Sequence, residues 1–484
     1  MLPPLIHRPR SGTERSSNER GFTMALVAVA LLSIVAMAAL SIDVGTLYQA
    51  KAEAQRAADA AALTAARVIS ISGITGDPTN KTDSWQKVCG GEGSPASLAA
   101  INVAQQNLIG GSAASTVKVY YGTNSGGGTN EDCSGAKSSF GVNPIVKVYV
   151  QQAKLPTFFA RVFSLIPGGT SSNSGVSATA SAEAFNPSDS ADAAGKMIPV
   201  QPRCVKPWVI PNIDPNGGSF VNTGDGSVSK KGILQLGVGV IGETVTLTAD
   251  CVPGAANCEL PLSPAGHIYD NPPGLRSPGL PPPPVPYLEY VPALVSGTPR
   301  AIPSCSPAIP ATGYQPAIAG CDQNTVYACG TVNGSLVDLT ENPVNPAGTG
   351  DTAAATQCLI HQSAGPDTLV TTNGKGTVFP FQIQAGSGNP LVGAGVSSDD
   401  VITSSDSIVT LPIADFAAGP MAGTQPSVTI TGFLQVFINN VVTTGSTAGN
   451  ITVTVLNVAG CSSATTNPPV FGTSPVPVRL ITPP

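Results

Sequence analysis

An uncharged apolar run near the N-terminus constrains this chain more than any other feature of its 484 residues. The run extends from Phe22 to Ile42 and contains neither Gly nor Pro. Its 21 residues match the roughly 20 that a helix needs to cross a bilayer. It leads without a break into an Ala-rich segment, Asp43 to Ile69. The sequence therefore predicts one helix that crosses a membrane and continues out of it.

The charges that flank the run predict its orientation. Four Arg residues precede it, and only Asp43 and then Lys51 follow closely. Because positive charge stays on the cytoplasmic side, we expect a cytoplasmic tail at residues 1–21, a transmembrane helix at 22–42 and an exported remainder. A cleaved secretory signal is the alternative, but its apolar core would be only about 7–15 residues long.

The start of the run leaves a second alternative open. Glu19 to Met24 resembles the processing site of type IV prepilins, which are cut after the Gly. That cleavage would separate Gly21 from Phe22 and give a minor pilin or a surface adhesin. Those proteins usually carry Glu at the fifth position after the cut, where this chain has Leu26.

Three motifs in tight succession carry a more specific resemblance. They are Arg-Gly before the apolar run, Asp-x-Gly-x-x-Tyr after it, and then an Ala-Ala-Asp run. The residues concerned are Arg20, Gly21, Asp43, Gly45, Tyr48, Ala57, Ala58 and Asp59. This order resembles the N-terminal module of TadG-like proteins of the Flp (Tad) pilus assembly system, over about residues 20–185.

The resemblance implies a bacterial inner-membrane protein with one membrane span. Its N-terminus would be cytoplasmic and its bulk periplasmic or extracellular. It would act in the assembly or anchoring of a Flp-type pilus, in contact with membrane lipid and with other pilus-assembly proteins.

Residues 43–185 are predicted to form a small α+β module. Residues 97–107 and 157–163 are expected to be short helices, the second by resemblance. Residues 117–121 and 145–150 have the β-branched and aromatic composition of strands, and 176–182 resembles the strand that closes the module.

The Ala-rich helix is amphipathic, with small side chains along one face. At 100° per residue this face contains Leu47, Ala50, Ala54, Ala57, Ala58, Ala61, Ala65 and Val68. Small side chains allow close packing, so we expect this stripe to pack on the module itself. Pairing with other subunits is the alternative.

Residues 186–484 are predicted to be largely all-β and rich in Pro and Gly. Short β-branched segments bounded by Gly, Pro, Asn or Ser lie at 233–241, 244–248, 427–431, 433–438 and 451–456. Residues 186–260 would form a first β-rich part and residues 317–484 a C-terminal one. Between them, 261–316 is so dense in Pro that we expect an extended segment. The whole chain is thus predicted to be α+β.

All ten cysteines follow the apolar run, and an even number in an exported chain favours disulfides. Cys89 with Cys133 would close the N-terminal module, and Cys251 with Cys258 and Cys321 with Cys329 are near enough for local bridges. Reduced thiols are the alternative, and the connectivity stays open. The full set is Cys89, Cys133, Cys204, Cys251, Cys258, Cys305, Cys321, Cys329, Cys358 and Cys461.

No catalytic motif is evident, so we expect a non-enzymatic protein without cofactor, metal or small-molecule substrate. The three histidines are isolated, and the absence of a basic cluster after residue 200 argues against nucleic acid. Asp225 to Ser229 and Asn212 to Gly217 have metal-loop spacings but are better explained as turns. An envelope hydrolase is the remaining alternative, and adjacent Asp399 and Asp400 on a strand would face opposite ways.

Overall fold

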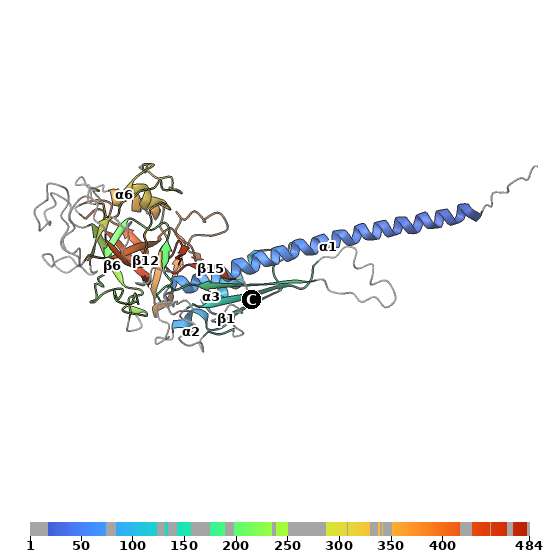
Figure 1. Ribbon diagram of the computed structural model, residues 1–484, viewed down its shortest axis with the longest axis horizontal. Coiled ribbons are helices and arrows are strands. Elements are labelled where there is room, and N and C mark those ends of the chain that lie inside the picture. Colours follow the sequence, from blue (N-terminus) through green and yellow to red (C-terminus); the bar gives the residue numbers. More distant parts are fainter. Residues whose placement is uncertain are drawn as a thin grey trace, which may run out of the picture.

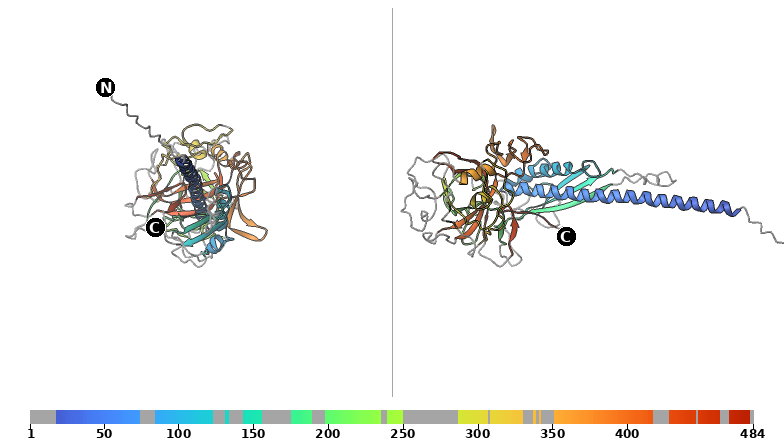
Figure 2. Two further views of the ribbon diagram at one scale, coloured as in Figure 1. Left: turned by 90° about the vertical axis from the view of Figure 1, so that its right-hand side faces the viewer. Right: turned by 90° about the horizontal axis from the view of Figure 1, so that it is seen from above.

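A long helix projects from a rounded body in the computed structural model of the chain (Figure 1). The structure describes residues 18–73, 84–122, 131–133, 143–155, 175–188, 198–234, 239–249, 287–306, 308–329, 337–338, 341, 351–416, 428–445, 447–461 and 468–481. Seen along the helix, the body surrounds its buried end, and from above the helix leaves the body at one side (Figure 2).

The predicted helix is confirmed as α1, Asn18–Ile71, a single element of 54 residues. Ala is the best helix former, which accounts for its continuity through the second half. The helix ends where Gly73 adopts the left-handed φ of 69°. A Cβ there would lie 2.7 Å from the Ile241 side chain and 2.9 Å from the Leu456 carbonyl oxygen. Only Gly therefore allows the chain to leave the helix at this point.

The second half of α1 packs on a four-stranded antiparallel sheet in the order β1-β2-β3-β15. The elements of this module, besides α1, are α2 (Ser84–Cys89), α3 (Pro95–Gln106), β1 (Thr116–Gly122), β2 (Ile145–Gln152), β3 (Val176–Ala184) and β15 (Val478–Ile481). The predicted helix at 97–107 and the three predicted strands of the module are confirmed. The helix predicted at 157–163 lies outside the described residues.

The Ala stripe of α1 packs on its own module, as predicted. Ala54, Ala57, Ala58, Ala61 and Ala65 have no exposed surface. They share one core with Trp85, the strand residues of the sheet and the Cys89–Cys133 disulfide, which is also confirmed. Methyl side chains let the α1 backbone approach the sheet closely, so no bulkier residue fits there without displacement.

The last strand of the module comes from the opposite end of the chain. In β15, Leu480 pairs with Ala182 of β3, and Arg479 forms an ion pair with Glu183. The guanidinium of Arg479 also lies over the Phe185 ring, 5.2 Å from its centroid. The sheet of the N-terminal module is therefore complete only when residues 478–481 return to it. The domain boundaries given above stay predictions.

The body contains a closed barrel with the strand order β11-β12-β13-β6-β7-β5. Its strands are β5 (Trp208–Pro211), β6 (Thr244–Ala249), β7 (Tyr287–Pro292), β11 (Ile408–Asp415), β12 (Thr429–Val441) and β13 (Ile451–Gly460). The prediction of a largely β region is confirmed. Two strands were predicted at 427–431 and 433–438, but residues 429–431 and 433–438 belong to the single strand β12, in which Gly432 stays paired with Gly460.

Smaller elements cover the barrel. The remaining described elements are β4 (Val200–Pro202), α5 (Tyr314–Ala319), α6 (Asp351–Leu359), β8 (Thr368–Asn373), β9 (Gly376–Gln384), β10 (Val401–Ile402) and β14 (Val470–Gly472). The strands pair as β10-β9-β8 and as β14-β4. Leu359 of α6 and Ile383 of β9 belong to the barrel core. Ile71 joins it too, so the end of α1 reaches from the module core into the barrel core.

Two predictions about residues 186–316 were wrong in part. The described residues of 233–241 form no strand, and Ile233 meets Ile241 only through an isolated bridge. Gly residues interrupt this segment, and Gly239 has a φ of 119°, which no regular strand adopts. Within 261–316, the described residues include β7 and the start of α5 rather than a continuous extended segment. Tyr287 to Val291 contains no Pro, so β7 can pair on both sides.

Three disulfides join distant parts of the body. They are Cys204–Cys321, Cys305–Cys358 and Cys329–Cys461. The predicted local bridge between Cys321 and Cys329 was wrong, because each is nearer in space to a cysteine more than 100 residues away. Cys251 and Cys258 lie outside the described residues.

Peptide mapping under non-reducing conditions tests this connectivity. We expect Cys321 to be recovered with Cys204, and Cys329 with Cys461, because the chain brings these cysteines together only through its fold. Recovery of a Cys321–Cys329 peptide would contradict the arrangement of the barrel and its cover.

Enlarging the Ala face of α1 should destabilise the module. Ala58→Leu inserts a larger side chain at a position with no exposed surface, and overpacking of this kind costs about 1–3 kcal/mol. Ala52→Leu, at an exposed position of the same helix, is the matched control and should leave stability almost unchanged. Chemical unfolding of the full chain in detergent measures both. Equal effects of the two variants would show that the stripe is not packed.

Candidate functional site

The first half of α1 exposes an apolar surface to the surroundings of the protein. The large side chains from Phe22 to Ile42 are between 50% (Leu40) and 77% (Met24) exposed. Among the described residues, α1 is the one helix that is both long enough and apolar enough to cross a membrane. A soluble protein rarely leaves so large a continuous apolar surface in water.

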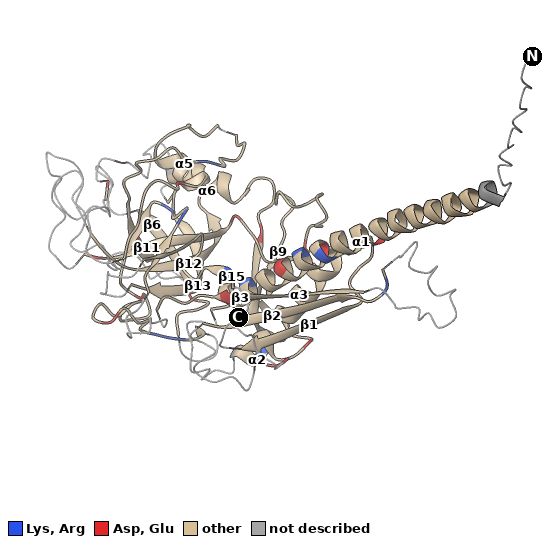
Figure 3. Cartoon of the chain, turned by 45° about the vertical axis from the view of Figure 1, so that its right-hand side comes forward, with Lys and Arg blue, Asp and Glu red and all other residues tan. Residues whose placement is uncertain are grey.

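The α1 helix contains no charged residue from Phe22 to Ile42. Charged residues return in its second half, where the helix meets the body (Figure 3). From there onward Lys51 donates to the Ser177 carbonyl of β3, and Glu53 accepts the Gly110 amide. That bond lowers the pKa of Glu53 below its usual value. The helix is thus divided into an apolar, projecting half and an amphipathic, packed half. This arrangement is typical of a membrane anchor or a signal segment.

The motif residues divide between the two roles. Arg20 and Gly21 lie in the first turn of α1, next to Phe22. Ala57 and Ala58 are buried against the sheet, and Asp43 is only 2% exposed. Ala57 and Ala58 therefore serve packing.

The other motif residues face outward or bind locally. Tyr48 is 75% exposed, and a Cβ on Gly45 would meet no atom within 4 Å. Asp59 accepts a hydrogen bond from Gln55 at 2.8 Å. Gly45 and Tyr48 therefore leave this part of α1 open, just beyond the apolar run.

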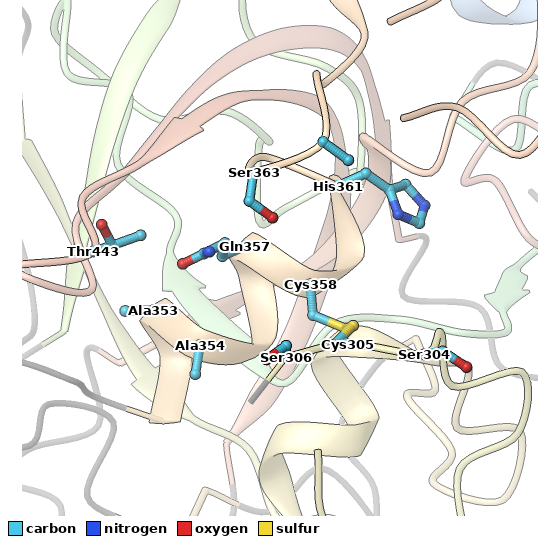
Figure 4. Close-up of a pocket in the computed structure, with 11 residues that line it drawn as sticks. Ser304, Cys305, Ser306, Ala353, Ala354, Gln357, Cys358, His361, Ser363 and Thr443 are labelled. Carbon is cyan, nitrogen blue, oxygen red and sulfur yellow. A yellow bond between two sulfur atoms is a disulfide. The ribbon is translucent and has the colours of Figure 1, made fainter. Parts of the chain in front are cut away.

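A cavity beside α6 contains the side chains closest to catalytic chemistry. It has a volume of about 220 Å³ and is lined by Ser304, Cys305, Ser306, Gln357, Cys358, His361, Ser363 and Thr443, among others (Figure 4). The disulfide forms one wall, and the His361 ring and Thr443 lie on opposite sides of α6.

The His361 ring binds Asp406, with 3.3 Å between Nε2 and Oδ2. A serine hydrolase needs a Ser hydroxyl on the other ring nitrogen. Within the described residues, no hydrogen bond joins His361 to a Ser. His7 and His267 lie outside the described residues.

The two predicted metal-like loops form turns. The Asp225 carboxylate accepts hydrogen bonds from the Ser227 amide and hydroxyl at 2.9 and 2.7 Å, which lower the pKa of Asp225. Asp214 accepts the Asn216 amide at 2.8 Å in an Asx-turn. Both carboxylates are thus used to hold the backbone.

The expectation that Asp399 and Asp400 lie on a strand was wrong. They lie in a turn before β10. Asp399 has a φ of 71°, and Asp400 accepts the Ser397 amide at 2.7 Å. The turn, rather than strand alternation, decides where the two carboxylates point.

Glu243 joins the Asp214 turn, which nothing in its sequence context predicted. Asn216 donates to Glu243 Oε1 at 2.5 Å, and Lys230 pairs with Asp214 at 2.7 Å. Glu243 is buried, and its Oε2 has no hydrogen-bond partner. Burial and the neighbouring Asp214 carboxylate raise the pKa of Glu243 to about 8.

A lysine is also buried in the body. The Lys206 ammonium donates to the carbonyl oxygens of Ile318 and Gly320 at 2.6 and 2.7 Å, beside the Cys204–Cys321 bridge. Burial lowers its pKa to about 7. Its two carbonyl contacts tie α5 to the chain before β5, so its role is structural.

The Glu243 carboxyl should make stability depend on pH. The folded state retains its proton up to about pH 8, whereas the unfolded chain releases it near pH 4.5, so stability falls as pH rises through this window. Glu243→Gln keeps the shape without the charge. It should remove this dependence and stabilise the protein at about pH 8, by on the order of 1–2 kcal/mol.

Chemical unfolding at about pH 5 and about pH 8 measures the effect. Glu131→Gln is the control, since Glu131 pairs with Lys118 at the surface and both are more than 40% exposed. A Glu243→Gln variant with the pH profile of the unchanged protein would contradict a protonated, buried Glu243.

Comparison with known proteins finds a family similarity for the first part of the chain. Residues 21–68 match a family model described as "Putative Flp pilus-assembly TadE/G-like". The match covers the apolar run and the Ala stripe and lies entirely within α1. The chain matches neither a curated protein nor a solved structure. Residues 21–68 of this chain are therefore similar to the TadE/G-like domain of that family.

Proposed function

We propose that this protein is a non-enzymatic, single-pass inner-membrane protein that acts in the assembly or anchoring of a Flp-type pilus. The observation that carries the proposal is α1 itself. It combines the segment that matches the pilus-assembly family with an exposed apolar half of the length a bilayer requires. The basic N-terminal flank supports a cytoplasmic N-terminus and an exported body.

In this proposal the body is a rigid contact module. Three disulfides hold the barrel and its cover together, as suits a protein outside the cytoplasm. Since α1 runs without interruption from the apolar half into the module and the barrel core, the body stands at a fixed orientation to the membrane. Other pilus-assembly proteins would dock on it.

A charge in the apolar half should prevent membrane insertion. Leu32 lies near the centre of the run and is 70% exposed, so Leu32→Arg would place an Arg in the bilayer at a cost of about 2.5–3.5 kcal/mol. The mutant chain should be lost from the fraction that resists alkaline carbonate. Tyr48→Arg, on the same helix beyond the run, is the control. Retention of the Leu32→Arg chain in that fraction would argue against a membrane span.

Deletion of the protein tests its role in the pilus. We expect cells without it to lose surface pili in electron micrographs, and expression of the unchanged protein, but not of Leu32→Arg, to restore them. Normal piliation of the deletion strain would reject the assembly role.

A minor pilin or surface adhesin, processed after Gly21, is the second candidate. It is favoured by the projecting half of α1, which leaves an apolar helix free to pack among other subunits, and by the Gly21–Phe22 junction at its start. Intact-mass measurement of the mature chain separates the two: a chain that begins at Phe22 supports the pilin, and one that retains residues 1–21 supports the anchor.

A further inference from the structure

The side chain of Arg67 lines a polar cavity at the junction between the module and the barrel. The cavity has a volume of about 400 Å³. Three segments that are distant in sequence form it: the end of α1, the residues after β10, and the connection from β14 to β15. The residues are Leu63, Thr64, Arg67, Thr403, Ser404, Gly472, Thr473, Ser474, Pro477 and Val478.

The charge of Arg67 is uncompensated in this cavity. Arg67 is partly buried, and the described part of the structure provides it with neither a hydrogen bond nor an ion pair. Burial lowers the pKa of its guanidinium, but an Arg stays charged in a protein. A charge that leaves water without a partner destabilises a fold. An anion in the cavity would remove that cost.

Five Ser and Thr residues line the cavity together with Arg67, and no carboxylate is among the described residues that line it. Thr64 donates to the Ala60 carbonyl, and Ser474 accepts from Gln435 at 2.8 Å. The hydroxyls of Thr403, Ser404 and Thr473 have no such engagement within the described residues. They can donate to an oxygen ligand held by Arg67.

Carboxylates on the elements beside the cavity are engaged by other groups. Glu183 of the adjoining strand is held by Arg479, and Asp59 of the same helix accepts from Gln55. The connection that carries Thr473 is itself fixed, because the Thr473 carbonyl accepts from Thr410 and the Gly472 carbonyl accepts the Arg203 amide at 2.7 Å. The cavity is therefore a preformed site.

We propose that this cavity binds an oxyanion of the phosphate or carboxylate type. The Arg67 guanidinium and the hydroxyls of Thr403, Ser404 and Thr473 would donate hydrogen bonds to it. The planar guanidinium matches two oxygens of such a group. A lipid headgroup is excluded as its source, because Arg67 lies 25 residues beyond Ile42, or about 37 Å along the helix. The inference does not depend on the pilus assignment.

Binding of free anions to the full chain in detergent tests the site. Inorganic phosphate and succinate are each added, with sodium chloride at equal ionic strength as the reference, and both unfolding temperature and calorimetric binding are recorded. A ligand of the folded state raises the unfolding temperature. Stabilisation by phosphate alone or succinate alone identifies the class of oxyanion. If neither anion binds, the proposal is overturned.

Two variants assign the binding to this cavity. Arg67→Gln should weaken binding about tenfold or more, since charge-assisted hydrogen bonds are the strong ones, without loss of stability in the absence of anion. Thr473→Val, which keeps the charge, should weaken binding severalfold and keeps the test open if Arg67→Gln fails to fold. Arg56→Gln, at an exposed position of α1, is the matched control. Equal binding by the unchanged protein and both cavity variants would overturn the site.

Discussion

The packing of methyl groups on the sheet is the interaction on which the rest of this structure depends. Seven alanines of α1 have no exposed surface, and this part of the helix packs against β2, β3 and α3. Burial of apolar surface is worth about 25 cal/mol per Å², so each Ala contributes little alone, but the stripe allows close backbone approach along several turns. It holds the helix that joins the apolar half to the body. Without it, the projecting half would have no fixed attachment.

The same helix also connects the two cores of the protein. Ser70 donates to the Val476 carbonyl at 2.6 Å, and Asn457 of β13 donates to the Ser70 carbonyl at 2.8 Å. Ile71 then contributes to the barrel core. Because β15 returns to the module sheet from the end of the chain, the module and the barrel are joined twice, at α1 and at residues 470–481. Such a double connection resists bending between the module and the barrel, as the proposed role of α1 as an anchor requires.

Two buried ionisable groups of the body make structural contacts. Burial raises the pKa of Glu243 to about 8 and lowers the pKa of Lys206 to about 7. Both lie within the barrel and its cover, far from α1 in sequence. Glu243 accepts a hydrogen bond from the Asn216 side chain in the Asp214 turn, and Lys206 donates to carbonyl oxygens at the end of α5. Shifted pKa values often mark catalytic sites, but structural clusters shift them as well. Here the Glu243 and Lys206 contacts hold a turn and the end of α5 in place.

The sequence by itself determined the long helix, its apolar run and its Ala stripe, because each depends on composition and on the 3.6-residue period within one continuous segment. The similarity of residues 21–68 to a pilus-assembly family also follows from sequence alone. It also suggested Cys89 and Cys133 as one possible pair, which the structure joins, and it predicted three of the four strands of the module sheet. Only the tertiary structure decided which strands close the barrel, that residues 478–481 complete the module sheet, and that Cys321 and Cys329 bind partners more than 100 residues away. It also brought Glu243 to Asp214 and the hydroxyls of three distant segments to Arg67. Local patterns predict local structure, whereas contacts between distant residues depend on how the chain closes its barrel and sheets.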